Sequence, residues 1–153
     1  MPKTRRRSTP LAWWALAAAL LVVTQIALGI AVNLYVHVPP RHPGANPGSY
    51  LGGSLHSLSW ALGSGAVALA AHTALGLAVA LCSTVVMGLA IAQRARGLIV
   101  WTGVAAAQVV GAGFNGASFL DFGRTYSSLA MALLSLGTLS CYLIVLTLYT
   151  ADH

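Results

Sequence analysis

The stretch LAWWALAAALLVVTQIALGIAVNLYV, residues 11–36, contains no Asp, Glu, Lys or Arg. A membrane has a hydrocarbon core about 30 Å thick, and a helix that rises about 1.5 Å per residue needs about 20 apolar residues to cross it. Residues 11–36 are long enough for this. They also exceed the apolar core of a cleaved signal peptide, which is about 7 to 15 residues long, so we expect a retained membrane-spanning helix.

Three further stretches have the same character, and every Lys, Arg, Asp and Glu of the chain lies outside all four. They are residues 65–92, 98–120 and 126–149. Each is continuously apolar rather than alternating, which predicts helices and not barrel strands. Of the 153 residues, 58% are hydrophobic and 7% are charged. The sequence therefore predicts an all-α integral membrane protein, a single domain over residues 1–153 that forms an antiparallel four-helix bundle.

The basic residues predict the orientation of the chain. Six of them fall on the side of the two termini and two on the other side. They are Lys3, Arg5, Arg6, Arg7, Arg94 and Arg96 against Arg41 and Arg124. Because Lys and Arg are enriched in cytoplasmic loops, we expect both termini in the cytoplasm and the chain in the plasma membrane. The same bias explains the net charge of +6, so the expected partner is the lipid bilayer and not nucleic acid.

The longest connection lies between the first two stretches. Residues 37–54 hold four of the six prolines and several glycines, which predicts an extracytoplasmic loop without a regular helix. Residues 54–64 carry polar side chains among leucines and leave two interpretations open. They extend the second spanning helix into the headgroup layer, or they form a separate helix that lies flat at the membrane surface.

Small and polar residues recur every four positions in two of the stretches. They are His72, Gly76, Ala80, Thr84 and Gly88 in the second, and Gly103, Ala107, Gly111 and Asn115 in the third. Helices associate in lipid through close packing of small residues and through hydrogen bonds, so both series predict buried seams. Gln25 and Gln108 fall near the midplane, where an amide commonly bonds to a neighbouring helix.

A polar cluster falls on the outer side of the spans when depth is counted at about 1.5 Å per residue. It consists of Asn33, Asn115, Asp121 and Arg124. Such a cluster in a membrane protein is a candidate functional site. The structural alternative is that Asp121 and Arg124, three residues apart, pair with each other in an exposed loop.

His72 is the one histidine inside a predicted span, where an unpaired ionisable group is costly. Two interpretations stay open. In the first, a neutral imidazole bonds to a backbone carbonyl or to an amide such as Asn115. In the second, His72 is an axial ligand of a b-type haem, and the Gly and Ala seam supplies the space. Met131, at a matching depth in the fourth stretch, is then the candidate for the other axial ligand.

Two segments carry a family resemblance, QIALGIAV at residues 25–32 and HTALGL at residues 72–77. They resemble the first two helices of one four-helix half of haem A synthase. In that family each half carries histidines on its second and fourth helices, on the outer side of the membrane. The resemblance implies that His72 is the second-helix ligand. The fourth stretch here has no histidine, and the family's enzyme has two such halves, so conversion of haem is not implied.

Signatures of an enzyme are few. The chain has no Glu, and its two acids, Asp121 and Asp152, fall at opposite membrane faces, which excludes a carboxylate pair for acid–base catalysis. The spacing of His37, His42 and His56 matches no compact zinc pattern, so no metal site is predicted.

The composition favours a small accessory or structural component of a membrane complex, and not an enzyme. Its expected assembly is a homo-oligomer or a larger membrane complex. A b-type haem protein that uses His72 is the alternative. Passage of a small solute or an ion through an oligomer is the third interpretation, along the Ser and Thr residues of residues 126–149.

Overall fold

The computed structural model describes residues 10–151, and the regular secondary structure within them consists of five α-helices, with no strand. The helices are α1 Pro10–Tyr35, α2 Tyr50–Gly63, α3 Val67–Gln93, α4 Arg96–Phe122 and α5 Thr125–Ala151. All except α2 are long and apolar enough to cross a membrane. Lys3, the arginines at 5–7 and Asp152, which entered the orientation and enzyme arguments, lie outside the described residues.

The four predicted spans are confirmed as helices, with ends that differ by one or two residues from those expected. The prediction of an irregular segment over residues 37–54 is wrong at its end, because α2 begins at Tyr50 and includes Gly52 and Gly53. A Cβ at Gly53 would collide with the ring of Pro47. This glycine therefore lets α2 pack closely on the preceding loop, and tertiary contact offsets its low helix propensity.

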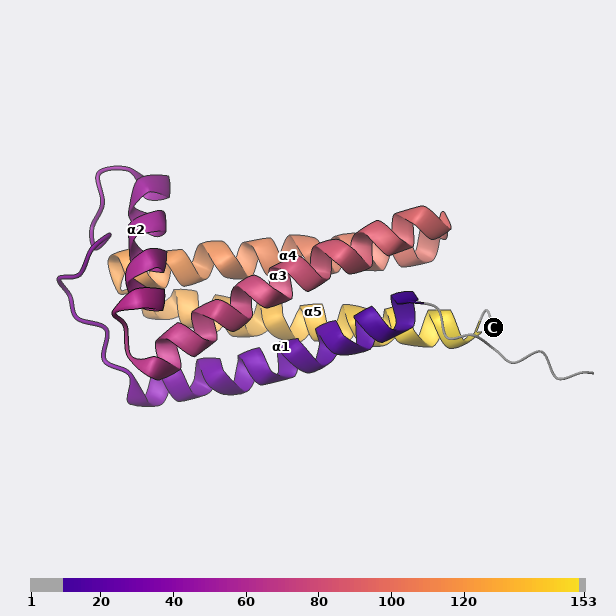
Figure 1. The fold of residues 1–153 in the computed structure, drawn as a ribbon, viewed down its shortest axis with the longest axis horizontal. Coiled ribbons are helices and arrows are strands. Elements are labelled where there is room, and N and C mark those ends of the chain that lie inside the picture. The colour runs from indigo at the N-terminus through magenta and orange to yellow at the C-terminus, as the bar shows by residue number, and fades with distance from the viewer. Residues whose placement is uncertain (1–9, 152–153) are drawn as a thin grey trace, which may run out of the picture.

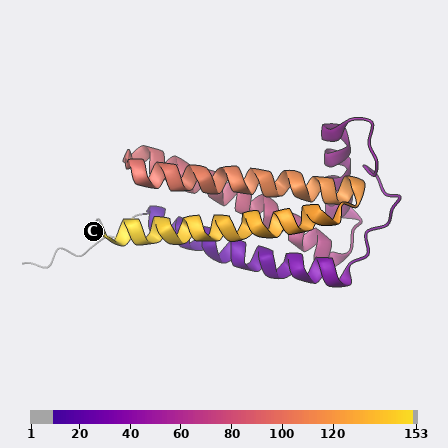
Figure 2. The ribbon, with the colours of Figure 1, turned by 180° about the vertical axis from the view of Figure 1, so that it is seen from behind.

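The long helices lie side by side, and each contacts two others (Figures 1 and 2). α1 packs against α3 and α5, and α4 packs against the same two. Neighbouring helices in this ring run in opposite directions. The start of α1 and the end of α5 therefore lie at the same end of the molecule (Figure 1). The turn between α3 and α4 lies at that end too, and α2 lies at the other.

α2 crosses the ends of the long helices instead of continuing α3 (Figure 1). The chain turns at residues 64–66, where the N–H groups of Ser64 and Gly65 both donate to the carbonyl oxygen of Trp60, at 2.8 and 2.9 Å. A Cβ at Gly65 would lie 2.7 Å from the carbonyl oxygen of Ala61, so only glycine fits this turn. Of the two interpretations of residues 54–64, the structure shows a separate helix.

Apolar side chains cover much of the outer surface of the long helices. Leu20, Ile30, Leu81 and Leu133 are all more than half exposed. In water, exposed apolar surface of this extent would be unfavourable, whereas acyl chains solvate it. The interior is filled by a cluster near the terminal end that includes Val22, Val86 and Tyr142, and by a smaller one beneath α2.

The predicted seams are buried over only part of their length. In α3, His72 and Gly76 contact α1, but Gly88 has no atom of another residue within 4 Å of a Cβ placed on it and is exposed. Gly103 in α4 also faces open space. An α-helix turns about 100° per residue, so each step of four drifts by about 40°. Over the four steps from His72 to Gly88, the series therefore turns from the face of α3 that contacts α1 to the face on the outside of the bundle.

Candidate functional site

Gln25 of α1 and His72 of α3 face each other, and their Nε2 atoms are 3.3 Å apart. Each side chain lies over a glycine of the other helix. A Cβ on Gly29 would lie 3.0 Å from Cε1 of His72, and a Cβ on Gly76 would lie 3.1 Å from Nε2 of Gln25. The spacing of four puts each polar residue and its glycine on one face of its helix. We call these four residues the reciprocal clasp.

The clasp corrects the predicted partner of His72. The amide beside the imidazole belongs to Gln25, whereas Asn115 donates from Nδ2 to the carbonyl oxygen of Gly111 in its own helix, at 2.9 Å. When the Gln25 amide donates to Nε2, the ring proton resides on Nδ1. Nδ1 of His72 and Oε1 of Gln25 are buried without a hydrogen-bond partner, so the clasp leaves one donor and one acceptor unused.

His72 and Met131 both contact neighbouring helices. Nε2 of His72 contacts the Gln25 amide, and the ring edge lies against Gly29. The sulfur of Met131 packs on Gly116 of α4, 3.2 Å from a Cβ placed there. At His72 and Gly76, the seam of α3 that was expected to provide space for a macrocycle lies in direct contact with α1.

The Gln108 amide, like that of Gln25, lies over a glycine of the facing helix. Gln108 of α4 lies over Gly137 of α5, where a Cβ would lie 2.8 Å from both its Oε1 and its Nε2. The thiol of Cys141 is 4.0 Å from Oε1 of Gln108. Both glutamines thus occupy positions that a glycine on the facing helix leaves open.

Asp121, in the last turn of α4, is buried, with 1% of its surface exposed. Its carboxylate accepts hydrogen bonds from the hydroxyls of Ser57 at 2.6 Å and Ser54 at 3.0 Å, both on α2. Its backbone carbonyl accepts the N–H of Asn46 at 2.7 Å. One residue thus fastens α4, α2 and the loop between α1 and α2 to one another.

The predicted pairing of Asp121 with Arg124 is wrong. Arg124 is exposed, and its guanidinium lies over the ring of Phe122, 4.9 Å from the centroid. The prediction assumed an exposed aspartate. Instead, α2 folds across the end of α4 and supplies hydroxyl donors, which satisfy the buried carboxylate.

The outer polar cluster is not brought to one place. Asn33 is exposed and accepts a hydrogen bond from the hydroxyl of Ser128 at 3.2 Å, which joins α1 to α5. Asn115 bonds within α4. Of the four predicted members, only Asp121 belongs to a connected site, and its partners Ser54 and Ser57 were not predicted. The available signal was the pair of hydroxyls three residues apart in residues 54–64, on one helix face.

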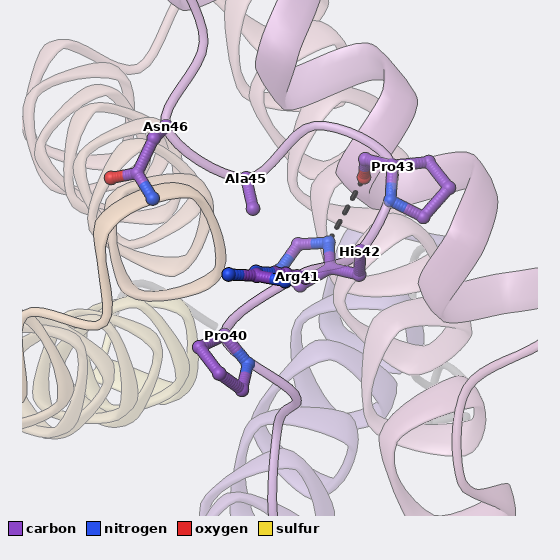
Figure 3. A pocket seen from close by; sticks show the side chains of 6 residues that line it. All are labelled: Pro40, Arg41, His42, Pro43, Ala45 and Asn46. Carbon is purple, nitrogen blue, oxygen red and sulfur yellow. Dashed lines mark hydrogen bonds between the residues drawn. The ribbon is translucent and has the colours of Figure 1, made fainter.

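His42 also connects the loop to α4. Its Nδ1 is 2.9 Å from the carbonyl oxygen of Pro43, and its Nε2 is 3.1 Å from the carbonyl oxygen of Leu120. The ring stacks on Trp60 of α2, with centroids 4.4 Å apart and planes 17° from parallel. Residues 40–46 surround an open hollow of about 460 Å³, shown in Figure 3 with the His42 ring bonded to the Pro43 carbonyl. We call Asp121, its two serines, Asn46 and His42 with Trp60 the outer lock.

Acidic side chains are rare in the described part of the chain. Asp121 is the only carboxylate side chain among residues 10–151. In that part of the chain no three His, Cys, Asp or Glu side chains lie close enough to hold a metal ion. Comparison of the chain with protein-family models, curated proteins and solved structures found no match.

Proposed function

We propose that this chain is an antiparallel four-helix bundle of the plasma membrane that serves as an accessory or structural component of a membrane complex. The reciprocal clasp carries the proposal. Gln25 and His72 contact each other and the glycine of the facing helix. Their placement favours helix association over binding or transport.

The proposed orientation places both termini in the cytoplasm. Arg94 and Arg96 lie at the turn between α3 and α4, at the same end as the described termini (Figure 1). The loop that contains Arg41 and the turn between α4 and α5 that contains Arg124 lie at the opposite end (Figure 1). Each end thus has two basic residues among residues 10–151, and the excess on the terminal side comes from the four that precede Pro10 in the sequence, Lys3, Arg5, Arg6 and Arg7. This bias supports the orientation.

The faces of α2 support a position in the outer headgroup layer. Its buried face consists of small residues, which are Gly53, Ser57 and Ala61. At about 100° per residue, one flank holds the exposed leucines and the other holds polar residues. The leucine flank consists of Leu51, Leu55 and Leu62, and the polar flank consists of His56 and Ser59. Leu51 borders a hollow of about 250 Å³ with Val110 and Phe114 of α4, so the leucine flank faces the middle of the spans.

The assembly state tests the proposal. The full chain is expressed in its native membrane, extracted into native nanodiscs without detergent, and analysed by native mass spectrometry. We expect complexes heavier than one copy, containing either further copies or a second protein at fixed stoichiometry. A single copy in every disc would overturn the proposal.

An absorption spectrum separates this proposal from the haem interpretation. We expect no Soret band from protein expressed with excess haem and purified in detergent, because the clasp takes up His72. A Soret band with reduced α and β bands that is lost in His72→Ala would overturn our expectation and make Met131 the next residue to change. Solute or ion flux in proteoliposomes would instead favour passage through an oligomer.

A further inference from the structure

Several hydroxyls of the spanning helices bond to their own helix. Thr84, Thr102 and Ser140 each donate to the carbonyl oxygen four residues back, at 2.8 to 2.9 Å. Such a local bond satisfies a hydroxyl that has no water to bond. Ser83 of α3 is 3% exposed, and its hydroxyl bonds neither to its own helix nor to any other described residue. Its side chain is therefore turned away from the carbonyl oxygens of α3.

A second buried hydroxyl lies beside that of Ser83. Tyr142 of α5 is fully buried in the apolar cluster near the terminal end, and its hydroxyl lies next to the Ser83 hydroxyl. The Tyr142 hydroxyl also has no hydrogen-bond partner among residues 10–151. Burial of a hydroxyl without a partner is unfavourable, and buried polar groups in native proteins are almost always bonded. Two neighbouring unpaired hydroxyls therefore point to a third group that bonds to both.

The two thiols of the chain do not supply this group. Cys82 of α3 and Cys141 of α5 are the sequence neighbours of the two hydroxyl residues. The sulfur of Cys82 lies 3.7 Å from the carbonyl oxygen of Trp14 on α1. The sulfur of Cys141 lies 4.0 Å from Oε1 of Gln108 on α4. Because α1 and α4 occupy opposite corners of the helix ring, the thiols are directed to opposite sides of the bundle.

The positions of α3 and α5 explain why the two hydroxyls meet in the interior. Each of these helices packs against α1 and α4, and the two do not pack directly against each other. They face one another across the centre of the bundle, where only side chains fill the space between them. A water molecule suits two hydroxyls at this place, because it both donates and accepts hydrogen bonds, as each hydroxyl does.

We propose that the hydroxyls of Ser83 and Tyr142 bind one water molecule at the centre of the bundle, which bridges α3 and α5. The water accepts a hydrogen bond from one hydroxyl and donates to the other, so that both are satisfied. It joins the helix pair α1 and α3 to the pair α4 and α5 near the terminal end. Asn33 and Ser128 form a polar link between the same pairs near the opposite end.

Removal of one oxygen at a time tests the site. Ser83→Ala and Tyr142→Phe each delete one hydroxyl and keep the rest of the side chain. In mixed micelles, we expect the unfolding equilibrium constant of the full chain to rise about threefold in each variant, as for one hydrogen bond between membrane helices. The double variant should be no less stable than either single variant, because the water leaves when one of its partners is removed. Ser140→Ala is the matched control. Its hydroxyl bonds to Leu136 in its own helix, so its effect should add to that of Tyr142→Phe.

Infrared difference spectroscopy identifies the bridging group as water. The spectrum of the wild type minus that of Tyr142→Phe, both in nanodiscs in D₂O, should contain an O–D stretching band. This band should shift when the D₂O carries heavy oxygen, because water exchanges its oxygen and the side chains do not. A band that is absent or does not shift would overturn the proposal. So would a gain in stability in either single variant, which would show that its hydroxyl had no partner to lose, and so would additive effects in the double variant.

Discussion

Replacement of Gly29 by alanine tests the reciprocal clasp directly. The new Cβ would lie 3.0 Å from Cε1 and 3.6 Å from Nδ1 of His72. Carbon atoms pack best at about 3.5 to 4.0 Å, so the ring must retreat from α1 by about half an ångström. Because His72 is already 3.3 Å from Gln25, the same retreat lengthens the contact between the two side chains.

Three contributions set the expected loss of stability. Overpacking costs about 1 to 3 kcal/mol, and a hydrogen bond between membrane helices contributes about 0.6 kcal/mol. The higher helix propensity of alanine returns up to about 1 kcal/mol. The free energy of unfolding should therefore fall by about 1 to 2 kcal/mol in Gly29→Ala. Gly88→Ala is the matched control, since no atom lies within 4 Å of its new Cβ, and it should gain up to about 1 kcal/mol.

The measurement is reversible unfolding in mixed micelles, with SDS titrated into dodecyl maltoside and helicity followed by circular dichroism. Gly29→Ala should unfold with a free energy about 2 kcal/mol lower than that of Gly88→Ala. If Gly29→Ala is as stable as the control, the His72 ring moves without cost. The clasp then does not hold α1 to α3, and the argument for a structural role of Gln25 and His72 fails.

Two further substitutions probe the outer lock. Asp121→Ala leaves two serine hydroxyls without their acceptor, so we expect the free energy of unfolding to fall by about 2 kcal/mol. Asp121→Asn should lose less stability, because one acceptor oxygen remains. If Asp121→Ala has the same free energy of unfolding as the wild type, the outer lock is contradicted. Gly53→Ala drives a Cβ into Pro47, so the loop should become sensitive to trypsin in proteoliposomes, whereas Gly113→Ala, which meets open space, should leave the cleavage rate unchanged.

The spanning helices were predictable because membrane thickness and the cost of charge act on every residue of a span. Their ends follow from where the charges are, at Arg94 and Arg96 and at Asp121 and Arg124. The start of α2 was not predictable in this way. Gly52 and Gly53 have low helix propensity. A glycine is required at position 53 only because Pro47 of the preceding loop packs on that face of α2.

The members of the sites were easier to predict than their partners. Gln25 and His72 stand out because each is polar inside a span, where polarity is costly, and Asp121 stands out as one of two acidic residues in the chain. Their partners depend on how the helices are rotated and on contacts between distant parts of the chain. Ser57 lies 64 positions from Asp121. Periodicity along one helix does not show which residue of a distant segment lies opposite it. Residues spaced four apart also do not stay on one face, because each step of four turns further around the helix.

The order along the chain of the two glutamines and the glycines that face them bears on how the protein enters the membrane during synthesis. Gln25 and Gln108 lie on α1 and α4, and their glycines, Gly76 and Gly137, lie on α3 and α5, which leave the ribosome later. Each amide is therefore exposed to lipid until the next spanning helix arrives. The translocon is expected to release the chain as two hairpins, α1 with α3 and then α4 with α5, because only a completed hairpin shields its glutamine.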